Sequence, residues 1–251
     1  MRFRFFDILL FALLFIFVNS FPIDLFGIPL IYQEVIRIGL RLLLLSYYIY
    51  VFTKNRINIF KFANYRRSLL FVPFLLACFS NFIAAGVAGL DFTAAVVDPA
   101  YLILVSFNLL LGVILEEILF RYIIQNSLVN ASSIKRIFGS AAIFALFHLL
   151  NLVNISSVDG LIAVLLQVAY TFGLGILLAI IYEYSYSLPL CMVFHLCFNI
   201  FNQLLPTYVF GLAIPDIYFT LSAVIIAVVL AVYIVVLYII KLKSCSKYFS
   251  E

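Results

Sequence analysis

Long apolar runs alternate with short polar or charged segments along the whole chain. An apolar run of about 20 residues is long enough to cross the hydrocarbon core of a membrane as a single helix. The pattern therefore predicts an all-α fold, a polytopic membrane bundle of about eight transmembrane helices. The expected spans are the N-terminal run within 1–21 and the segments at about 36–52, 69–90, 101–130, 137–153, 161–182, 188–205 and 218–240.

Composition strengthens the membrane assignment. Hydrophobic residues make up 67% of the 251 residues, charged residues make up 10%, and the mean hydropathy is +1.25. These shares differ strongly from those of soluble domains and leave no room for a sizeable soluble domain. No internal repeat is evident, so we expect one integral membrane domain over 1–251. Within it we expect N-terminal spans in 1–95, a catalytic core in 96–210, and a final span with a basic tail in 211–251.

The placement of charge predicts an orientation. The formal net charge of +4 is too small and too scattered for nucleic-acid binding. Most Lys and Arg residues fall near the two chain ends and in alternate loops, around 54–67 and 135–136. Because basic loops stay on the cytoplasmic side, both termini are expected there. The N-terminal run lacks a small-x-small cleavage pattern, so we expect a retained span. The small size and short loops favour a bacterial plasma membrane protein.

Charged residues interrupt one of the predicted spans. The run LLLGVILEEILFRYII, residues 109–124, contains Glu116, Glu117 and Arg121. A charged side chain at the centre of a membrane helix costs about 2.5–3.5 kcal/mol, so each needs a partner, a wet cavity or a function. Glu117 and Arg121 are four residues apart and share a helix face, which predicts an ion pair. Glu116 points elsewhere and is left free for chemistry.

Both histidines of the chain also lie in predicted spans. His148 follows Phe144 by four residues, which puts the two on one helix face, where we expect Phe144 to shape the site. His195, Asn199 and Asn202 are spaced to form one polar stripe, although Asn202 is also typical of a simple interhelical hydrogen bond. At about 1.5 Å per residue, Glu116 and these polar groups reach overlapping depths. They are therefore expected to converge on one buried, wet site that opens toward the cytoplasm.

This set of side chains suits hydrolysis of an amide bond. Glu116 is the candidate general base that takes a proton from water, and His148 is placed to hold or co-activate that water. His195 and Asn199 are candidate donors to the developing oxyanion. The pair Glu117 and Arg121 would orient the neighbouring carboxylate and neutralise charge.

Simpler interpretations stay open beside this one. Glu117 and Arg121 can serve only to hold their helix together, and Arg37 and Arg41 can pair locally with Glu34 or extend to the interface. Intramembrane Glu, Arg and His also occur in proton-coupled transporters, which predict repeat symmetry and broken helices. A third possibility is a non-catalytic immunity or scaffold protein of the same fold.

Three sequence motifs resemble those of the CPBP intramembrane proteases, which include CAAX prenyl endopeptidases and bacterial Abi and bacteriocin-processing proteins. They are EEILFR at 116–121, FALFH at 144–148 and HLCFN at 195–199. The resemblance implies a glutamate protease in which Glu116 and His148 activate water and His195 and Asn199 stabilise the tetrahedral intermediate. It also implies a peptide or protein substrate with a membrane-proximal cleavage site, either a prenylated C-terminus or a leader peptide. The oligomeric state stays open.

The resemblance implies no cofactor, although zinc is the alternative to consider. Two histidines and a glutamate form a minimal zinc-binding set, but no H-E-x-x-H helix is present. The four cysteines form no zinc-like pair and no disulfide framework. We therefore expect metal-independent hydrolysis.

Overall fold

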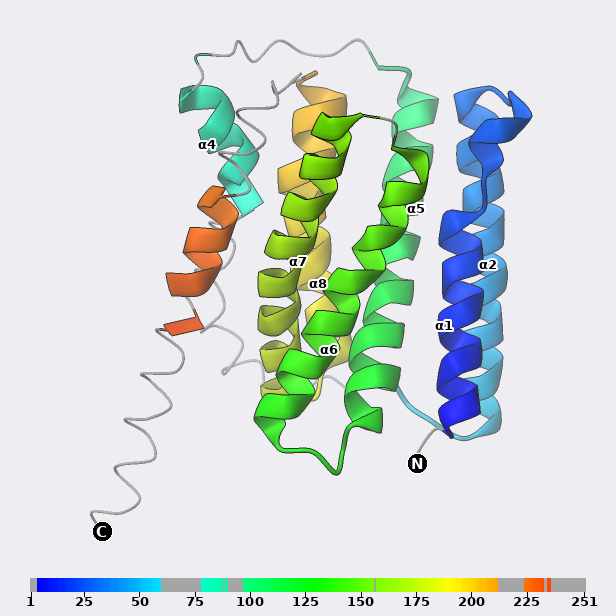
Figure 1. The fold of residues 1–251 in the computed structure, drawn as a ribbon. Helices are drawn as coiled ribbons and strands as arrows, with labels where there is room; N and C mark the ends of the chain where they lie inside the picture. Colours follow the sequence, from blue (N-terminus) through cyan, green and yellow to red (C-terminus); the bar gives the residue numbers. More distant parts are fainter. Residues whose placement is uncertain are drawn as a thin grey trace.

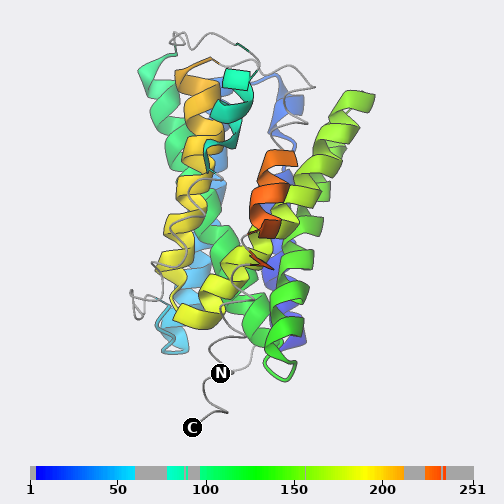
Figure 2. The same cartoon turned by 90° about the vertical axis from the view of Figure 1, so that its left-hand side faces the viewer.

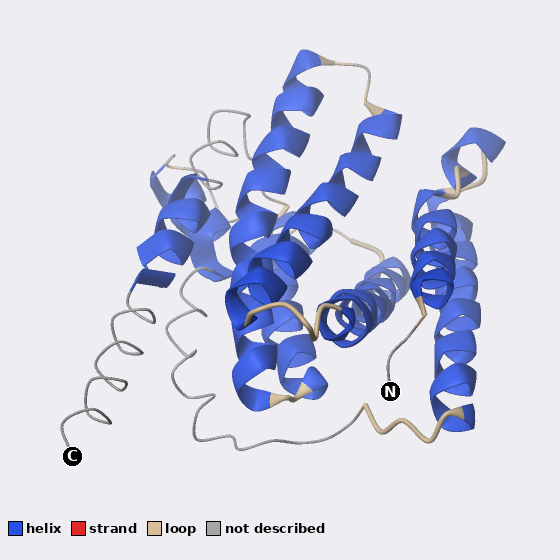
Figure 3. Cartoon of the chain, turned by 60° about the horizontal axis from the view of Figure 1, so that its bottom comes forward, coloured by secondary structure: helices blue, strands red, loops and turns tan. Residues whose placement is uncertain are grey.

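The computed structural model describes residues 4–59, 78–87, 89, 97–155, 157–211, 224–232 and 234–235. Within this described part, every regular element is a helix and no strand occurs (Figure 3). Five helices are long and apolar enough to cross a membrane, which agrees with the predicted integral membrane bundle. They span Leu30–Lys54, Pro99–Gln125, Ser133–Val153, Val158–Glu183 and Leu188–Val209.

Two further expected spans are described only in part. The third expected span contains α4, Ser80–Val87, and the last contains helical residues 224–232 and 234–235. Their remaining residues lie outside the described part, so the expected total of eight spans stays a prediction. The first expected span is the apolar helix α1, Phe5–Ser20.

Capping residues set where the membrane helices begin. Asp98 accepts a hydrogen bond from the backbone N–H of Ala100 at the start of α5, Pro99–Glu117. Serines 132, 157 and 187 do the same for three later helices, as each side chain accepts a bond from a backbone N–H in the first turn. Such caps satisfy N–H groups that a helix leaves unpaired at its start. The helices concerned are α6, Ser133–Phe147, α7, Val158–Ser185, and α8, Leu188–Asn199.

The helices pack around α5, to which α2 runs parallel. The hairpin of α1 and α2, Leu30–Lys54, stands on one side of α5, and α6, α7 and α8 stand on the other (Figure 1). α6 and α7 approach closely at Gly175, where a Cβ would come within 3.1 Å of the Ala141 Cα. Figure 2 shows that α6 and α7 lean away from α8 toward the top of the bundle. The helices therefore diverge at one end and pack tightly at the other.

Three of the membrane helices change type part-way along their length. α5 continues as a π-helix, η3, Ile118–Gln125, and α8 continues as a π-helix, η5, Ile200–Val209. α6 continues as a 3₁₀-helix, η4, His148–Asn154. Such changes within a helix often mark functional positions. Here each change falls at or next to one of the three motifs found in the sequence.

The two ends of the bundle differ in charge. At the bottom in Figure 1, α1 begins, α2 ends and α6 begins, and the described basic residues Arg4, Lys54, Arg56, Lys135 and Arg136 gather there. Arg136 forms an ion pair with Glu183, which also accepts a hydrogen bond of 2.9 Å from Ser133 Oγ. The opposite end has Asp98, the N-cap of α5, and Asp159 in the first turn of α7. We refer below to the basic end and the acidic end of the bundle.

Candidate functional site

Glu117 and Arg121 form a buried layer within the bundle. Both side chains are fully buried, and Arg121 Nε donates to Glu117 Oε2 at 3.2 Å, which confirms the predicted ion pair. Arg121 Nη1 also donates to Ser140 Oγ at 3.0 Å, and the guanidinium carbon lies 5.1 Å from the centre of the Phe144 ring. We call Glu117, Arg121 and Ser140 the buried layer. It links α5 and η3 to α6.

The buried layer also holds His195 in a defined state. His195 Nδ1 lies 2.8 Å from Glu117 Oε1. A carboxylate oxygen accepts hydrogen bonds, so Nδ1 carries a proton and donates it to Glu117. The other ring nitrogen, Nε2, lies 3.7 Å from Glu116 Oε2. His195 thus stands between the two adjacent glutamates, bonded to one and facing the other.

His148 is fixed by its own helix. Its Nδ1 lies 3.0 Å from the backbone oxygen of Phe144, one turn earlier. Because that oxygen can only accept, Nδ1 is the donor and the Nε2 of a neutral ring keeps a free lone pair. The Phe144 ring stands edge-on to both histidines, with ring centres 5.0 Å from His148 and 5.8 Å from His195. The Phe144 ring therefore packs against both imidazoles.

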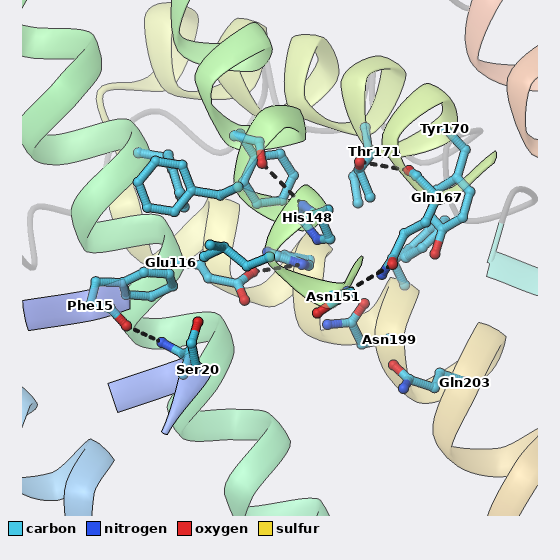
Figure 4. Close-up of a pocket in the computed structure, with 18 of the residues that line it drawn as sticks. Phe15, Ser20, Glu116, His148, Asn151, Gln167, Tyr170, Thr171, Asn199 and Gln203 are labelled. Atoms are coloured by element: carbon cyan, nitrogen blue, oxygen red, sulfur yellow. Dashed lines mark hydrogen bonds and ion pairs between the residues drawn. The ribbon is translucent and has the colours of Figure 1, made fainter. Parts of the chain in front are cut away.

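A cavity of about 340 Å³ lies over these side chains. Glu116, with 25% of its side chain exposed, lines it together with His148, His195, Asn199 and Phe144. In Figure 4, Phe15 and Ser20 of α1 lie on one side of Glu116, and Asn151, Gln167 and Gln203 lie on the other. Five carboxamides line the cavity, and two of them bond to each other, as Asn151 Nδ2 donates to Gln167 Oε1 at 2.8 Å. The carboxamides are those of Asn19, Asn151, Gln167, Asn199 and Gln203.

Comparison with known proteins places this site in a family. Residues 98–201 match the family described as type II CAAX prenyl endopeptidase Rce1-like. This match confirms the resemblance to the CPBP intramembrane proteases over the segment, which we call the Rce1-like domain. No curated protein and no solved structure matches the chain. The Rce1-like domain contains all three motifs, and the match supports protease activity in general.

The helices α1 and α2 lie outside the matched segment, yet they close one side of the cavity of the Rce1-like domain. Arg41 of α2 lines this side, a placement that the sequence did not predict. It does not pair with Glu34, whose Oε1 binds Arg37 at 2.9 Å. The expectation of local pairing is thus correct for Arg37 and wrong for Arg41. The sequence signal is that Arg41 sits mid-span with no acidic residue three or four positions away.

Asn202 does not reach the cavity of the Rce1-like domain. Its Oδ1 instead accepts hydrogen bonds from Ser80 Oγ at 2.5 Å and from the backbone N–H of Asn81 at 3.2 Å. Asn202 therefore makes the interhelical hydrogen bond that its sequence position also predicts, and its expected role in shaping the site stays a prediction. The cause of this placement is the change to a π-helix after Asn199, because a π-turn holds more residues and rotates later side chains away from an α-helical stripe.

The cavity extends toward the acidic end of the bundle. Its lining includes Asn19 and Ser20 at the end of α1 and Val153 near the end of η4, of which Asn19 and Val153 are exposed. These positions lie at the opposite end from the basic residues. The sequence instead leads us to expect a site that opens toward the basic end, assigned to the cytoplasm, and the side from which substrate enters stays a prediction.

Metal binding was the alternative chemistry. No group of three or more His, Cys, Asp or Glu side chains suited to a metal ion occurs in the described part of the chain. In the described part, the side chains that most resemble a metal-binding set are Glu116, His148 and His195, which could offer a carboxylate and two Nε2 atoms. The Nδ1 atoms of both histidines are already hydrogen-bonded to oxygen.

Proposed function

We propose that the chain is an intramembrane endopeptidase that hydrolyses a peptide bond in a membrane-associated peptide or protein. The observation that carries this proposal is the cavity in which the Glu116 carboxylate, His148 Nε2, His195 Nε2 and the Asn199 amide face one volume. The five carboxamides support a peptide substrate, because each can both donate to and accept from a peptide backbone.

The proposed reaction uses water as the nucleophile. Glu116 takes one proton from a water molecule held by His148, and the water oxygen attacks the carbonyl carbon. The resulting oxyanion receives hydrogen bonds from Asn199 and from His195 Nε2. Breakdown of the tetrahedral intermediate breaks the C–N bond, and Glu116 returns its proton to the leaving amine. The products are a carboxylic acid and an amine, and the acid then ionises by releasing its proton to the amine or to water.

The role of His195 requires a proton on Nε2. Its Nδ1 already donates to Glu117, so donation from Nε2 as well needs the imidazolium form. Glu117 Oε1 at 2.8 Å from Nδ1 and Glu116 Oε2 at 3.7 Å from Nε2 flank the ring. We therefore assign Glu117 and Arg121 to positioning His195, without contact to the substrate.

The test is Glu116→Gln, which keeps the size of the side chain and removes the base. Cleavage of a peptide found by comparing membrane peptidomes with and without the active protein should fall by roughly 10²–10⁴-fold. Lys135→Gln, at an exposed residue of the basic end outside the cavity lining, is the control. Unchanged turnover in Glu116→Gln would contradict the mechanism, and inhibition by chelators would favour the zinc variant. A cell phenotype that survives Glu116→Gln would favour a scaffold protein.

We further propose that both termini face the cytoplasm of a bacterium, as the basic end suggests. The cavity would then open to the outer side of the plasma membrane, and substrate would arrive from that side. Two exposed residues in first helical turns at opposite ends test this, Asp159 in α7 and Lys135 in α6. In a cysteine-free background, a membrane-impermeant maleimide should label Asp159→Cys in intact cells. Lys135→Cys should react only after permeabilisation, and the reverse result would invert the orientation.

A further inference from the structure

A buried serine behind the cavity joins two of the helices that carry the proposed site. Ser140 of α6 is fully buried and is not among the residues that line the cavity. Its hydroxyl donates a hydrogen bond to the backbone oxygen of Phe120 at 2.9 Å and accepts one from Arg121 Nη1 at 3.0 Å. Both partners lie in η3, which runs beside α6 toward the basic end (Figure 1). One side chain thus makes two hydrogen bonds between α6 and η3.

A hydroxyl suits this position because it can donate and accept at the same time. The backbone oxygen of Phe120 can only accept, and the guanidinium of Arg121 can only donate. In the described part of the chain, the hydrogen bonds of Arg121 go to Glu117 and Ser140, and its Nη2 has no partner. Without the hydroxyl, two of the three guanidinium nitrogens would have no described partner in the interior, which favours a shift of the Arg121 side chain.

The bond from Arg121 to Ser140 leads to one of the two histidines. Arg121 Nε donates to Glu117 Oε2 at 3.2 Å, and Glu117 Oε1 accepts from His195 Nδ1 at 2.8 Å. All four side chains are buried. A shift of the guanidinium would therefore move the carboxylate that holds His195.

Ser140 also fixes the helix that leads to the other histidine. Phe144 and His148 follow Ser140 by four and eight residues, along α6 and into η4. These separations are about 6 and 12 Å at the rise of an α-helix. The Phe144 ring centre lies 5.1 Å from the guanidinium carbon of Arg121, and the Phe144 backbone oxygen accepts from His148 Nδ1. The register of α6 against η3 therefore sets where His148 stands relative to Glu116.

We propose that Ser140 is a positioning residue, whose hydroxyl fixes the register between α6 and η3 and so the placement of both histidines around Glu116. Serine is specific in this role, because alanine can make neither bond and threonine can make both. This inference rests on the proposed peptidase function, which assigns the roles of Glu116 and the histidines. The match to the Rce1-like family covers residue 140 and assigns it no role.

The first test follows the kinetics when the hydroxyl is removed and restored. Displacement of groups that take part in the reaction slows the chemical step more than it weakens binding. Ser140→Ala should therefore lower kcat by roughly ten- to a hundredfold, with KM for the peptide used for Glu116→Gln within about twofold of wild type. Ser140→Thr, which keeps the hydroxyl, should restore most of kcat. Rates are expressed per folded full-length chain in detergent.

The matched control is Ser185→Ala at the end of α7. Ser185 is also a buried serine, whose hydroxyl donates to Ile181 O at 2.7 Å and accepts from the backbone N–H of Ser187 at 3.1 Å. It is not among the residues that line the cavity. Ser185→Ala should keep kcat within about twofold of wild type, because its two hydrogen bonds are local to the end of α7. An equal loss of kcat in Ser185→Ala and Ser140→Ala would indicate a general effect of lost stability and overturn the inference.

A second measurement does not depend on cleavage. The chain has two histidines, so isotope-labelled histidine gives NMR signals from His148 and His195 alone, and His195→Gln assigns them. Ser140→Ala should shift or broaden the Nδ1–H signals of both rings, whereas Ser140→Thr and Ser185→Ala should keep the wild-type signals. Unchanged histidine signals in Ser140→Ala, or an unchanged kcat, overturns the inference. Shifted signals in Ser140→Ala, when the wild type cleaves nothing, would support Ser140 as a positioning residue and contradict the peptidase proposal.

Discussion

Two adjacent carboxylates, Glu116 and Glu117, lie in different environments on either side of one helix. Glu117 is fully buried and bonded to both Arg121 and His195. Glu116 faces the cavity, is one quarter exposed, and has His195 Nε2 as its nearest described charged partner at 3.7 Å. The partners of Glu117 hold its carboxylate in place, whereas the carboxylate of Glu116 is accessible from the cavity. The comparison separates charges that organise the site from a charge that is free to react.

The same distinction holds for the two asparagines that follow in α8 and η5. Asn199 lines the cavity, and Asn202 bonds to α4 on the far side. Both are polar residues in one membrane span, three positions apart. One asparagine therefore faces the cavity, and the other connects two helices by hydrogen bonds.

The largest expected effect is the difference in stability between variants of Glu117 and variants of Glu116. Glu117→Gln leaves Arg121 buried without a carboxylate, which should lower the free energy of unfolding by about 3–5 kcal/mol. It should also abolish cleavage, because His195 loses the partner of its Nδ1. Glu116→Gln, at a cavity-facing position, should change the free energy of unfolding by only about 0.5 kcal/mol. Unfolding in mixed micelles with increasing dodecyl sulfate measures both variants.

The double variant Glu117→Gln, Arg121→Met sharpens this prediction. Replacing both partners removes the orphaned charge, so stability should recover while cleavage stays lost. If the double variant regains activity, Glu117 does not position His195. If Glu116→Gln destabilises as strongly as Glu117→Gln, the division of the two carboxylates is wrong.

Much of this site follows from local rules. The Glu117–Arg121 ion pair follows from a spacing of four on a helix, and the shared depth of Glu116, His148 and His195 follows from helical rise. Both depend only on residues within one span or on the span ends. The sequence therefore predicts the membrane bundle and the set of side chains that meet.

The remaining features depend on tertiary structure. The helix-type changes rotate Asn202 away from the cavity, and no residue pattern around Ile200 indicates a π-helix. The hydrogen bond from His195 to Glu117 joins residues 78 positions apart, so helical spacing does not predict it. Arg41 is held at the cavity by hydrogen bonds to Asn19 and Asn108 on two other helices. The direction of the cavity likewise depends on how α6 and α7 lean away from α8 (Figure 2).

The next effect in size concerns Asn199. If its amide stabilises the oxyanion, Asn199→Ala should lower kcat by roughly 10²–10³-fold. The affinity for substrate and the free energy of unfolding should change little, because the Asn199 side chain lines the cavity. The kcat and KM of purified protein, measured with the same peptide as for Glu116→Gln, provide the check. A rise in KM with unchanged kcat would instead assign Asn199 to ground-state binding.

The smallest expected effect is that of Asn202→Ala, which pairs with the Asn199 variant as its structural counterpart. The substitution removes the acceptor for Ser80 Oγ and the Asn81 N–H, so the free energy of unfolding should fall by about 1–3 kcal/mol. Because Asn202 faces α4 and lies outside the cavity lining, kcat and KM of the folded protein should stay within about twofold of wild type. If kcat falls as much as in Asn199→Ala, contacts between α4 and η5 affect the cavity. That result would contradict the claim that Asn202 has a purely structural role.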